Sequence, residues 1–114
     1  MKKMAYLRKE YETVETDHSL TEVWLAVQSV LRRLKWKTEL VDETGHHVEA
    51  RTKAGFMSYG SLLLIDIVPV DKKTTRVSVA AETPTTMITG MVDFGQARDR
   101  INLFLTALAK QLTG

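Results

Sequence analysis

The most apolar stretch of the chain reads YGSLLLIDIVPV and covers residues 59–70. Gly60 precedes the apolar run, and the polar residues 71–73 follow it. A run of this length that is apolar on both sides is typical of a strand buried on both faces of a sheet. We therefore predict that this strand lies in the middle of a sheet, with Asp66 as its single charged residue.

Four further stretches have the composition and alternation of strands, namely residues 5–14, 36–42, 46–52 and 74–82. Charged residues on both faces of the first stretch favour an edge position. In the second stretch, Trp36, Thr38 and Leu40 share one face. Residues 43–45 predict a hairpin turn in which Gly45 takes a positive φ. The inner face of the last two stretches is predicted to carry Val48, Ala50, Val77, Val79 and Ala81.

Two amphipathic helices complete the pattern. Ser19 and Glu22 have the spacing of a capping box, which satisfies two backbone N–H groups at a helix start. The apolar stripe that follows contains Leu20, Val23, Trp24, Val27, Val30, Leu31 and Leu34. After a predicted loop over residues 84–92, Asp93 and Gln96 predict a second capped start. The second stripe contains Phe94, Ala97, Ile101, Phe104, Leu105, Leu108 and Leu112.

The order of elements is therefore β-α-β-β-β-β-α, and residues 1–114 are predicted to form a single α+β domain. We expect a curled antiparallel sheet with two helices packed on one face, because both apolar stripes need the same apolar surface to cover. The other face of the sheet then meets water or a partner.

The composition of the chain excludes several classes of protein and of functional site. The chain has 114 residues, of which 44% are hydrophobic and 26% charged, which is typical of a globular protein. It contains no cysteine, so disulfides, thiolate catalysis and cysteine zinc sites are excluded. The first ten residues lack the apolar segment of a signal peptide, and the apolar runs are too short for a membrane span, so we expect a cytoplasmic protein. Sixteen basic against 14 acidic residues do not by themselves indicate nucleic-acid binding.

Asp66 is the candidate for an acid-base group, because a carboxylate in an apolar strand needs a partner. The alternative that we favour places Asp66 on the open sheet face, paired with a lysine or an arginine, with Arg76 on the next strand as one candidate. His46 and His47 are adjacent on a strand and point to opposite faces, so with His18 they do not predict a metal site. We expect no metal, no cofactor and no catalytic residue.

Four basic residues gather where the first helix ends and the next strand begins, at Arg32, Arg33, Lys35 and Lys37. Their favourable interaction with the helix C-terminal dipole is sufficient reason for them. Together with Arg51 and Lys53 they are also the candidate for a weak nucleic-acid surface.

An apolar group within the predicted loop contains Met87, Ile88, Met91 and Val92, and Leu103 falls outside the stripe of the second helix. These side chains either cover one end of the core or form a pocket rim or a self-association surface, so a homodimer stays open. The residues that we assign to a ligand site are Tyr59, Leu63, Met87, Met91 and Phe104.

Several segments together resemble a class of small prokaryotic α+β domains of unknown function. They are Val23, Trp24 and Val27 in a capped helix, Leu34-Lys35-Trp36, the hairpin with Gly45, residues 48–52, Ser58-Tyr59-Gly60, and Asp93-Phe94-Gly95 before Arg98 and Ile101. In outline the chain resembles helix-grip (or TBP-like) domains, including those of outer-membrane assembly lipoproteins. The resemblance implies a last helix lying in a curved sheet and carries no catalytic residues. This sequence lacks the lipidation cysteine and signal peptide of the lipoproteins.

Three functional hypotheses follow. The first is a non-enzymatic module that binds an apolar small molecule under the second helix, or a partner protein at a free sheet edge. The second is an enzyme that uses Asp66 with a histidine or serine in one cleft. The third is a weak nucleic-acid binder through Arg32, Arg33, Lys35 and Lys37.

Overall fold

A computed structural model describes residues 6–52, 60–85 and 96–113 of the chain. Seven elements follow one another along it: β1 (Tyr6–Thr16), α1 (Leu20–Leu34), β2 (Lys37–Asp42), β3 (His47–Arg51), β4 (Leu62–Pro69), β5 (Thr75–Thr85) and α2 (Gln96–Thr113). The predicted order β-α-β-β-β-β-α is confirmed.

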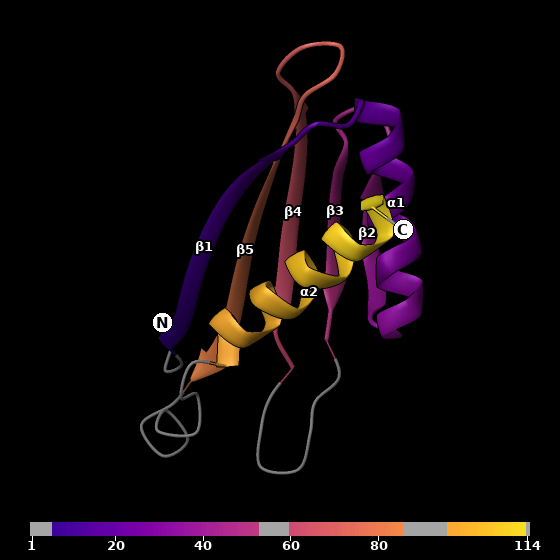
Figure 1. Cartoon of the computed structure of the whole chain (residues 1–114). Helices are drawn as coiled ribbons and strands as arrows, with labels where there is room; N and C mark the ends of the chain where they lie inside the picture. The colour runs from indigo at the N-terminus through magenta and orange to yellow at the C-terminus, as the bar shows by residue number, and fades with distance from the viewer. Residues whose placement is uncertain (1–5, 53–59, 86–95, 114) are drawn as a thin grey trace.

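The five strands form one antiparallel sheet in the order β1-β5-β4-β3-β2. Strand β4, the most apolar of the five, is the middle one, as its sequence predicts. Strands β1 and β2 are the two edges, although they are neighbours in sequence, because α1 carries the chain from one edge to the other (Figure 1).

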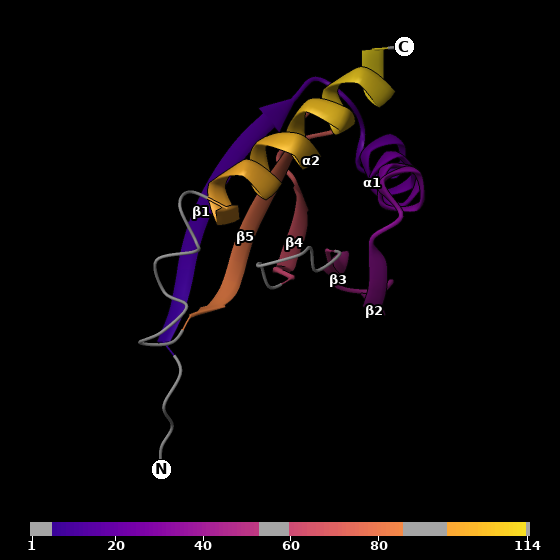
Figure 2. The same cartoon turned by 90° about the horizontal axis from the view of Figure 1, so that it is seen from below.

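Both helices pack on the same face of the curled sheet, which we call the covered face (Figure 2). Helix α2 packs against β5, β1 and α1, while α1 packs against β4 and β2. The strand residues of the covered face that are almost or completely buried are Val48, Ala50, Leu63, Ile65, Ile67, Val77, Val79 and Ala81. The predicted inner faces of β3 and β5 are therefore confirmed.

Helix α1 begins at the predicted capping box. The Ser19 hydroxyl accepts the backbone N–H of Glu22, and the Glu22 carboxylate accepts the backbone N–H of Ser19. The helix ends at Lys35, which adopts the left-handed conformation with φ of 62°. Trp36 then enters the core with 8% of its surface exposed.

Helix α2 buries the stripe that the sequence predicts. Ala97, Ile101 and Phe104 are completely enclosed and Leu108 nearly so, whereas Leu103 is 47% exposed. The predicted cap Asp93 and the stripe residue Phe94 lie outside the described residues.

Three local predictions are wrong. A bulge between Thr38 and Leu40 shifts the register of β2, so Leu40 lies opposite Glu49 on the open face and Val41 opposite Val48 on the covered face. The positive φ in the following turn belongs to His46, at 51°. Strand β5 runs on to Thr85, past the predicted start of a loop at residue 84.

The strand registers align side chains in rows across the covered face. One row contains Val48, Ile65, Val79 and Glu12. The next, one step toward the starts of β1 and β4, contains Ala50, Leu63, Ala81 and Glu10. The second row therefore has smaller side chains than the first, and we call it the alanine row.

Candidate functional site

The alanine row lies near the end of the sheet where β3 stops and β4 begins. Ala50, Leu63 and Ala81 each have no solvent exposure. Ala97, in the first turn of α2, is also completely enclosed. Alanines take the positions that the two valines occupy in the adjacent row, so the alanine row has less side-chain volume beneath the helix.

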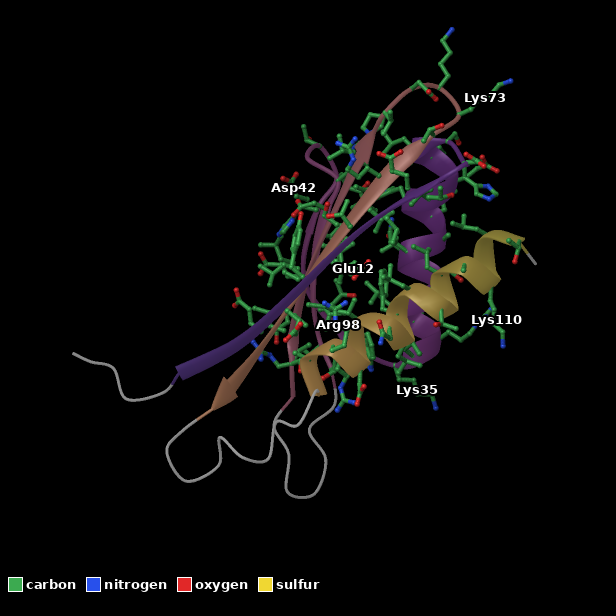
Figure 3. All side chains as sticks on the ribbon, turned by 60° about the vertical axis from the view of Figure 1, so that its left-hand side comes forward. Glu12, Lys35, Asp42, Lys73, Arg98 and Lys110 are labelled. Atoms are coloured by element: carbon green, nitrogen blue, oxygen red, sulfur yellow. The ribbon has the colours of Figure 1, made fainter. Side chains whose placement is uncertain are left out.

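Arg98 joins the start of α2 to the edge strand β1 (Figure 3). Its guanidinium donates to Glu12 at 2.8 Å, to Glu10 at 3.2 Å and to the backbone oxygen of Tyr11 at 3.1 Å. The hydrogen bonds to Glu12 and then Glu10 raise the pKa of Arg98 above its ordinary value. Both carboxylates belong to the covered face, so this side of the alanine row ends in a cluster of one guanidinium and two carboxylates.

Arg100 extends to the opposite side of the buried stripe of α2, toward the end of β3. Its Nε donates to the hydroxyl oxygen of Thr52 at 3.3 Å. Thr52 is 3% exposed and Ser61 is completely buried. The two are fixed to each other, because the N–H of Thr52 donates to the oxygen of Ser61 at 2.9 Å and the N–H of Ser61 donates to the Thr52 hydroxyl at 2.8 Å.

The structure places two of the five predicted ligand-site residues, Leu63 and Phe104, in the same core beneath α2. Leu63 belongs to the alanine row and Phe104 to the buried stripe of the helix. Tyr59, Met87 and Met91 lie outside the described residues, as do Ile88 and Val92. The assignment of these five residues to a site remains a prediction.

The predicted pair of Asp66 with Arg76 is wrong. Asp66 Oδ1 lies 2.7 Å from Nδ1 of His47 on β3, and the other ring nitrogen of His47 lies 2.8 Å from Glu49. Arg76 instead donates to Glu15 at 2.9 Å. The register is the reason: Asp66 is opposite His47 on one side and Ser78 on the other, while Arg76 is opposite Val68.

This cluster lies on the open face, where the Asp66 side chain is 54% exposed. Both nitrogens of His47 contact carboxylates, and hydrogen bonding to Glu49 and Asp66 raises its pKa. Asp66 also lies between His47 and Ser78 in its row, so the imidazole is not next to the serine hydroxyl. The arrangement does not form a nucleophile-base pair.

The other predicted groups stay apart. His46 packs edge-on against Trp24 with ring centroids 5.0 Å apart, and His18 lies beside Glu22. Within the described ranges no three metal-binding side chains gather. Arg32, Arg33, Lys35 and Lys37 are exposed, and Arg51 pairs with Glu39 at 3.1 Å. Neither described helix is long and apolar enough to cross a lipid bilayer.

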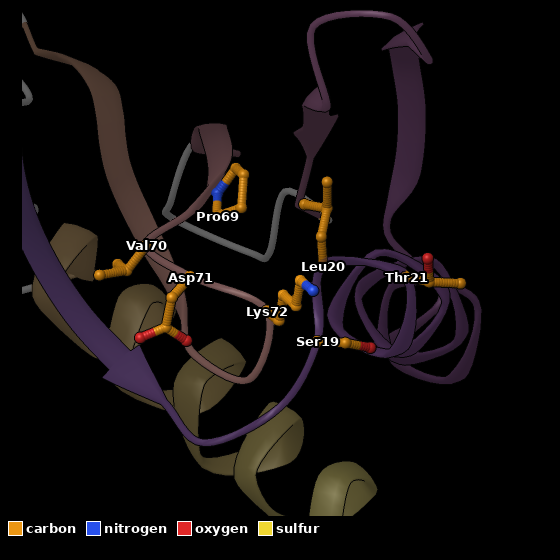
Figure 4. Close-up of a pocket in the computed structure, with 7 residues that line it drawn as sticks. All are labelled: Ser19, Leu20, Thr21, Pro69, Val70, Asp71 and Lys72. Atoms are coloured by element: carbon orange, nitrogen blue, oxygen red, sulfur yellow. The ribbon is translucent and has the colours of Figure 1, made fainter.

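Among the described residues, two hollows lie away from the alanine row. One, of about 220 Å³, lies between the end of β1 and the last turns of α2, and is lined by Val14, Glu15, Thr16, Leu105, Leu108, Ala109 and Leu112. The other, of about 510 Å³, is an open depression between residues 19–21 and 69–72 (Figure 4). Its helix N-terminus is already capped by Ser19 and Glu22, so the depression offers little to an anion.

Comparison with known proteins gives the fold. No protein-family model and no curated protein matches the chain. The X-ray structure of norcoclaurine synthase from Thalictrum flavum superposes with a TM-score of 0.73 at 11% identity, over 96% of this chain and 88% of that one. An aromatase/cyclase from Streptomyces sp. R1128 gives 0.70 at 11% identity, over 95% and 94% of the two chains. A START superfamily protein from Mycobacterium smegmatis gives 0.65 at 12% identity, over 92% and 97%.

This is a helix-grip fold. It is the architecture of START and Bet v 1-like proteins, and the predicted curled sheet with two helices on one face is confirmed. At these identities the likeness concerns the helix-grip fold alone. The resemblance to outer-membrane assembly lipoproteins remains an expectation.

Sequence reasoning missed the polar end of the alanine row. Glu10 and Glu12 alternate in an edge strand, which looked like protection against pairing with other chains. Arg98 and Arg100 look like ordinary surface residues of a helix. The available signal was their spacing: they lie on either side of the stripe that contains Ala97 and Ile101, so both point toward the rim of the surface that α2 covers.

Proposed function

We propose that this chain binds a small apolar molecule between α2 and the covered face of the sheet, at the alanine row. The observation that carries the proposal is a set of small, fully enclosed side chains, Ala50 and Ala81 on the sheet and Ala97 on α2, next to a row of larger side chains. Small-molecule sites in proteins are mostly apolar concave spaces with a few polar groups at defined positions.

The fold comparison supports binding of a small molecule. One of the norcoclaurine synthase structures that superpose on 96% of this chain is a complex with dopamine and hydroxybenzaldehyde. In this chain, polar groups are confined to the ends of the alanine row, at Glu10 with Arg98 and at Thr52 with Arg100. A ligand with an apolar body and one polar end matches that distribution.

Thermal unfolding with a panel of medium-chain alcohols and aromatic aldehydes tests the proposal, together with native mass spectrometry for a co-purified molecule. Binding to the folded state alone raises Tm with ligand concentration. The variant Ala81→Leu fills space in the alanine row and is expected to remove the Tm increase.

Ala80→Leu is the matched control, because Ala80 is the neighbouring residue on β5 and points to the open face. It is expected to bind like the unaltered chain. Ala50→Val provides a smaller filling change if Ala81→Leu does not fold. A folded Ala81→Leu and a folded Ala50→Val that both keep the full Tm increase would place the ligand elsewhere.

The two rival functions are less well supported. The Asp66 cluster is solvated and its histidine is not next to Ser78, which disfavours the enzyme hypothesis. The basic residues after α1 have no described aromatic side chain exposed among them on which a base would stack. Cytoplasmic location and a homodimer stay as proposals that gel filtration and fractionation can test.

A further inference from the structure

Arg100 has no described partner of opposite charge, which distinguishes it from Arg98, Arg51 and Arg76. Arg98 pairs with Glu10 and Glu12, Arg51 with Glu39 and Arg76 with Glu15. For Arg100, the polar contact within residues 6–52, 60–85 and 96–113 is its Nε donation to Thr52. Its side chain is nevertheless half-buried. A partly buried cation without a counter-charge is costly, and an anion bound beside it removes that cost.

The position of Arg100 is fixed by the structure around it. Thr52 accepts from both Arg100 and the backbone N–H of Ser61, and it is buried, so it does not move freely. Because Nε is used by Thr52, the two terminal nitrogens of the guanidinium remain for another group. These nitrogens present parallel N–H donors, which match the two oxygens of a carboxylate.

The alanine row begins directly beside this group. Thr52 lies just after β3, two residues past Ala50, and Ser61 lies just before β4, two residues ahead of Leu63. An apolar body in the alanine row would therefore end at Arg100 on one side and at the Arg98 cluster on the other. Since Arg98 is neutralised by two carboxylates, Arg100 is the end that attracts a negative charge.

We propose that the ligand of this chain is an apolar carboxylic acid, held with its body in the alanine row and its carboxylate on the terminal nitrogens of Arg100. This inference rests on the proposed function and names its ligand class. The chemistry recognised is a single carboxylate attached to an apolar chain or ring.

Isothermal titration with decanoate, methyl decanoate and decan-1-ol separates the assignment of a carboxylate to Arg100 from the proposed binding of an apolar molecule. Decanoate is expected to bind at least about tenfold more tightly than the ester and the alcohol at low salt, as for a charge-assisted hydrogen bond. Arg100→Met is expected to reduce the affinity for decanoate to that for the ester, and to leave the affinity for the ester unchanged. Arg51→Met, on the open face, is the control and is expected to leave all three affinities unchanged.

Equal binding of acid, ester and alcohol by the unaltered chain would overturn the carboxylate assignment and leave the proposed function standing. Absence of binding by all three would overturn both. If Arg100→Met does not fold, a pH titration of the carbon-13 signal of labelled decanoate, bound to the unaltered chain, tests the assignment. The carboxyl pKa of the bound decanoate is expected to lie below that of free decanoate, because a guanidinium favours the ionised form. An unlowered pKa would overturn the assignment.

Discussion

His47 shows how one side chain connects two strands on the open face. Its ring lies between Glu49 on its own strand and Asp66 on β4, at 2.8 and 2.7 Å. Hydrogen bonding to Glu49, followed by Asp66, raises the pKa of His47 above its ordinary 6.5, against the opposing effect of burial. A raised folded-state pKa means that the folded protein binds the proton more tightly than the unfolded chain does.

The stability that His47 contributes is therefore complete below about pH 6.5 and is lost as the pH rises through the folded-state pKa. We expect the free energy of unfolding, from urea titrations at several pH values, to fall across that window. His47→Gln is expected to remove this fall, and Asp66→Asn to reduce it. A proton NMR titration that places the His47 midpoint at or below 6.5 would contradict the prediction.

Residue-level pairing was the part least accessible from sequence. The need of Asp66 for a partner was predicted correctly, because a carboxylate among aliphatic residues requires one. The partner was wrong, because Arg76 and His47 are both on strands next to β4 and only the register decides between them. Arg100 was missed for a similar reason, since nothing local indicates that Thr52 lies beside it.

Helix α1 is the element whose start the sequence defines best. Ser19→Ala removes the hydroxyl that accepts the Glu22 N–H, so we expect the free energy of unfolding to fall by about 1 kcal/mol. Thr21→Ala, which deletes an exposed hydroxyl in the same turn, is the control and is expected to have almost no effect. Urea denaturation measures both, and equal losses in the two variants would show that the cap is unimportant.

At the level of elements, the periodicity of apolar residues predicted every strand and helix. Bulges and strand ends depend instead on how neighbouring strands pair. The bulge in β2 arises from its match to β3, so alternation alone put Leu40 on the wrong face. Pro84 looked like a strand breaker. It is tolerated because β4 pairs with β5 only as far as Glu82, and beyond that residue β5 pairs with β1 alone. A proline without an N–H fits a strand that has one free edge.

For the molecule as a whole, both helices and the sheet share a single core, and Phe104 lies within it with no exposure. Phe104→Ala is expected to lower the free energy of unfolding by about 3–5 kcal/mol, a large part of the stability of a domain of this size. Leu103→Ala, at a neighbouring and 47% exposed position, is expected to change it by less than about 0.5 kcal/mol. Similar losses for both variants would contradict the packing of α2 on the sheet.

The place of β1 in the sheet has a consequence for synthesis. Its Thr13 hydrogen-bonds Ser78, which is 65 residues later, so β1 is made before the other strands of the sheet and has no neighbour until β5 has been made. The meander from β2 to β5 needs only nearby partners and is able to form earlier. A nascent chain interrupted before residue 75 would therefore expose an unpaired strand with eleven residues of open backbone, a natural target for a chaperone or for a second such chain.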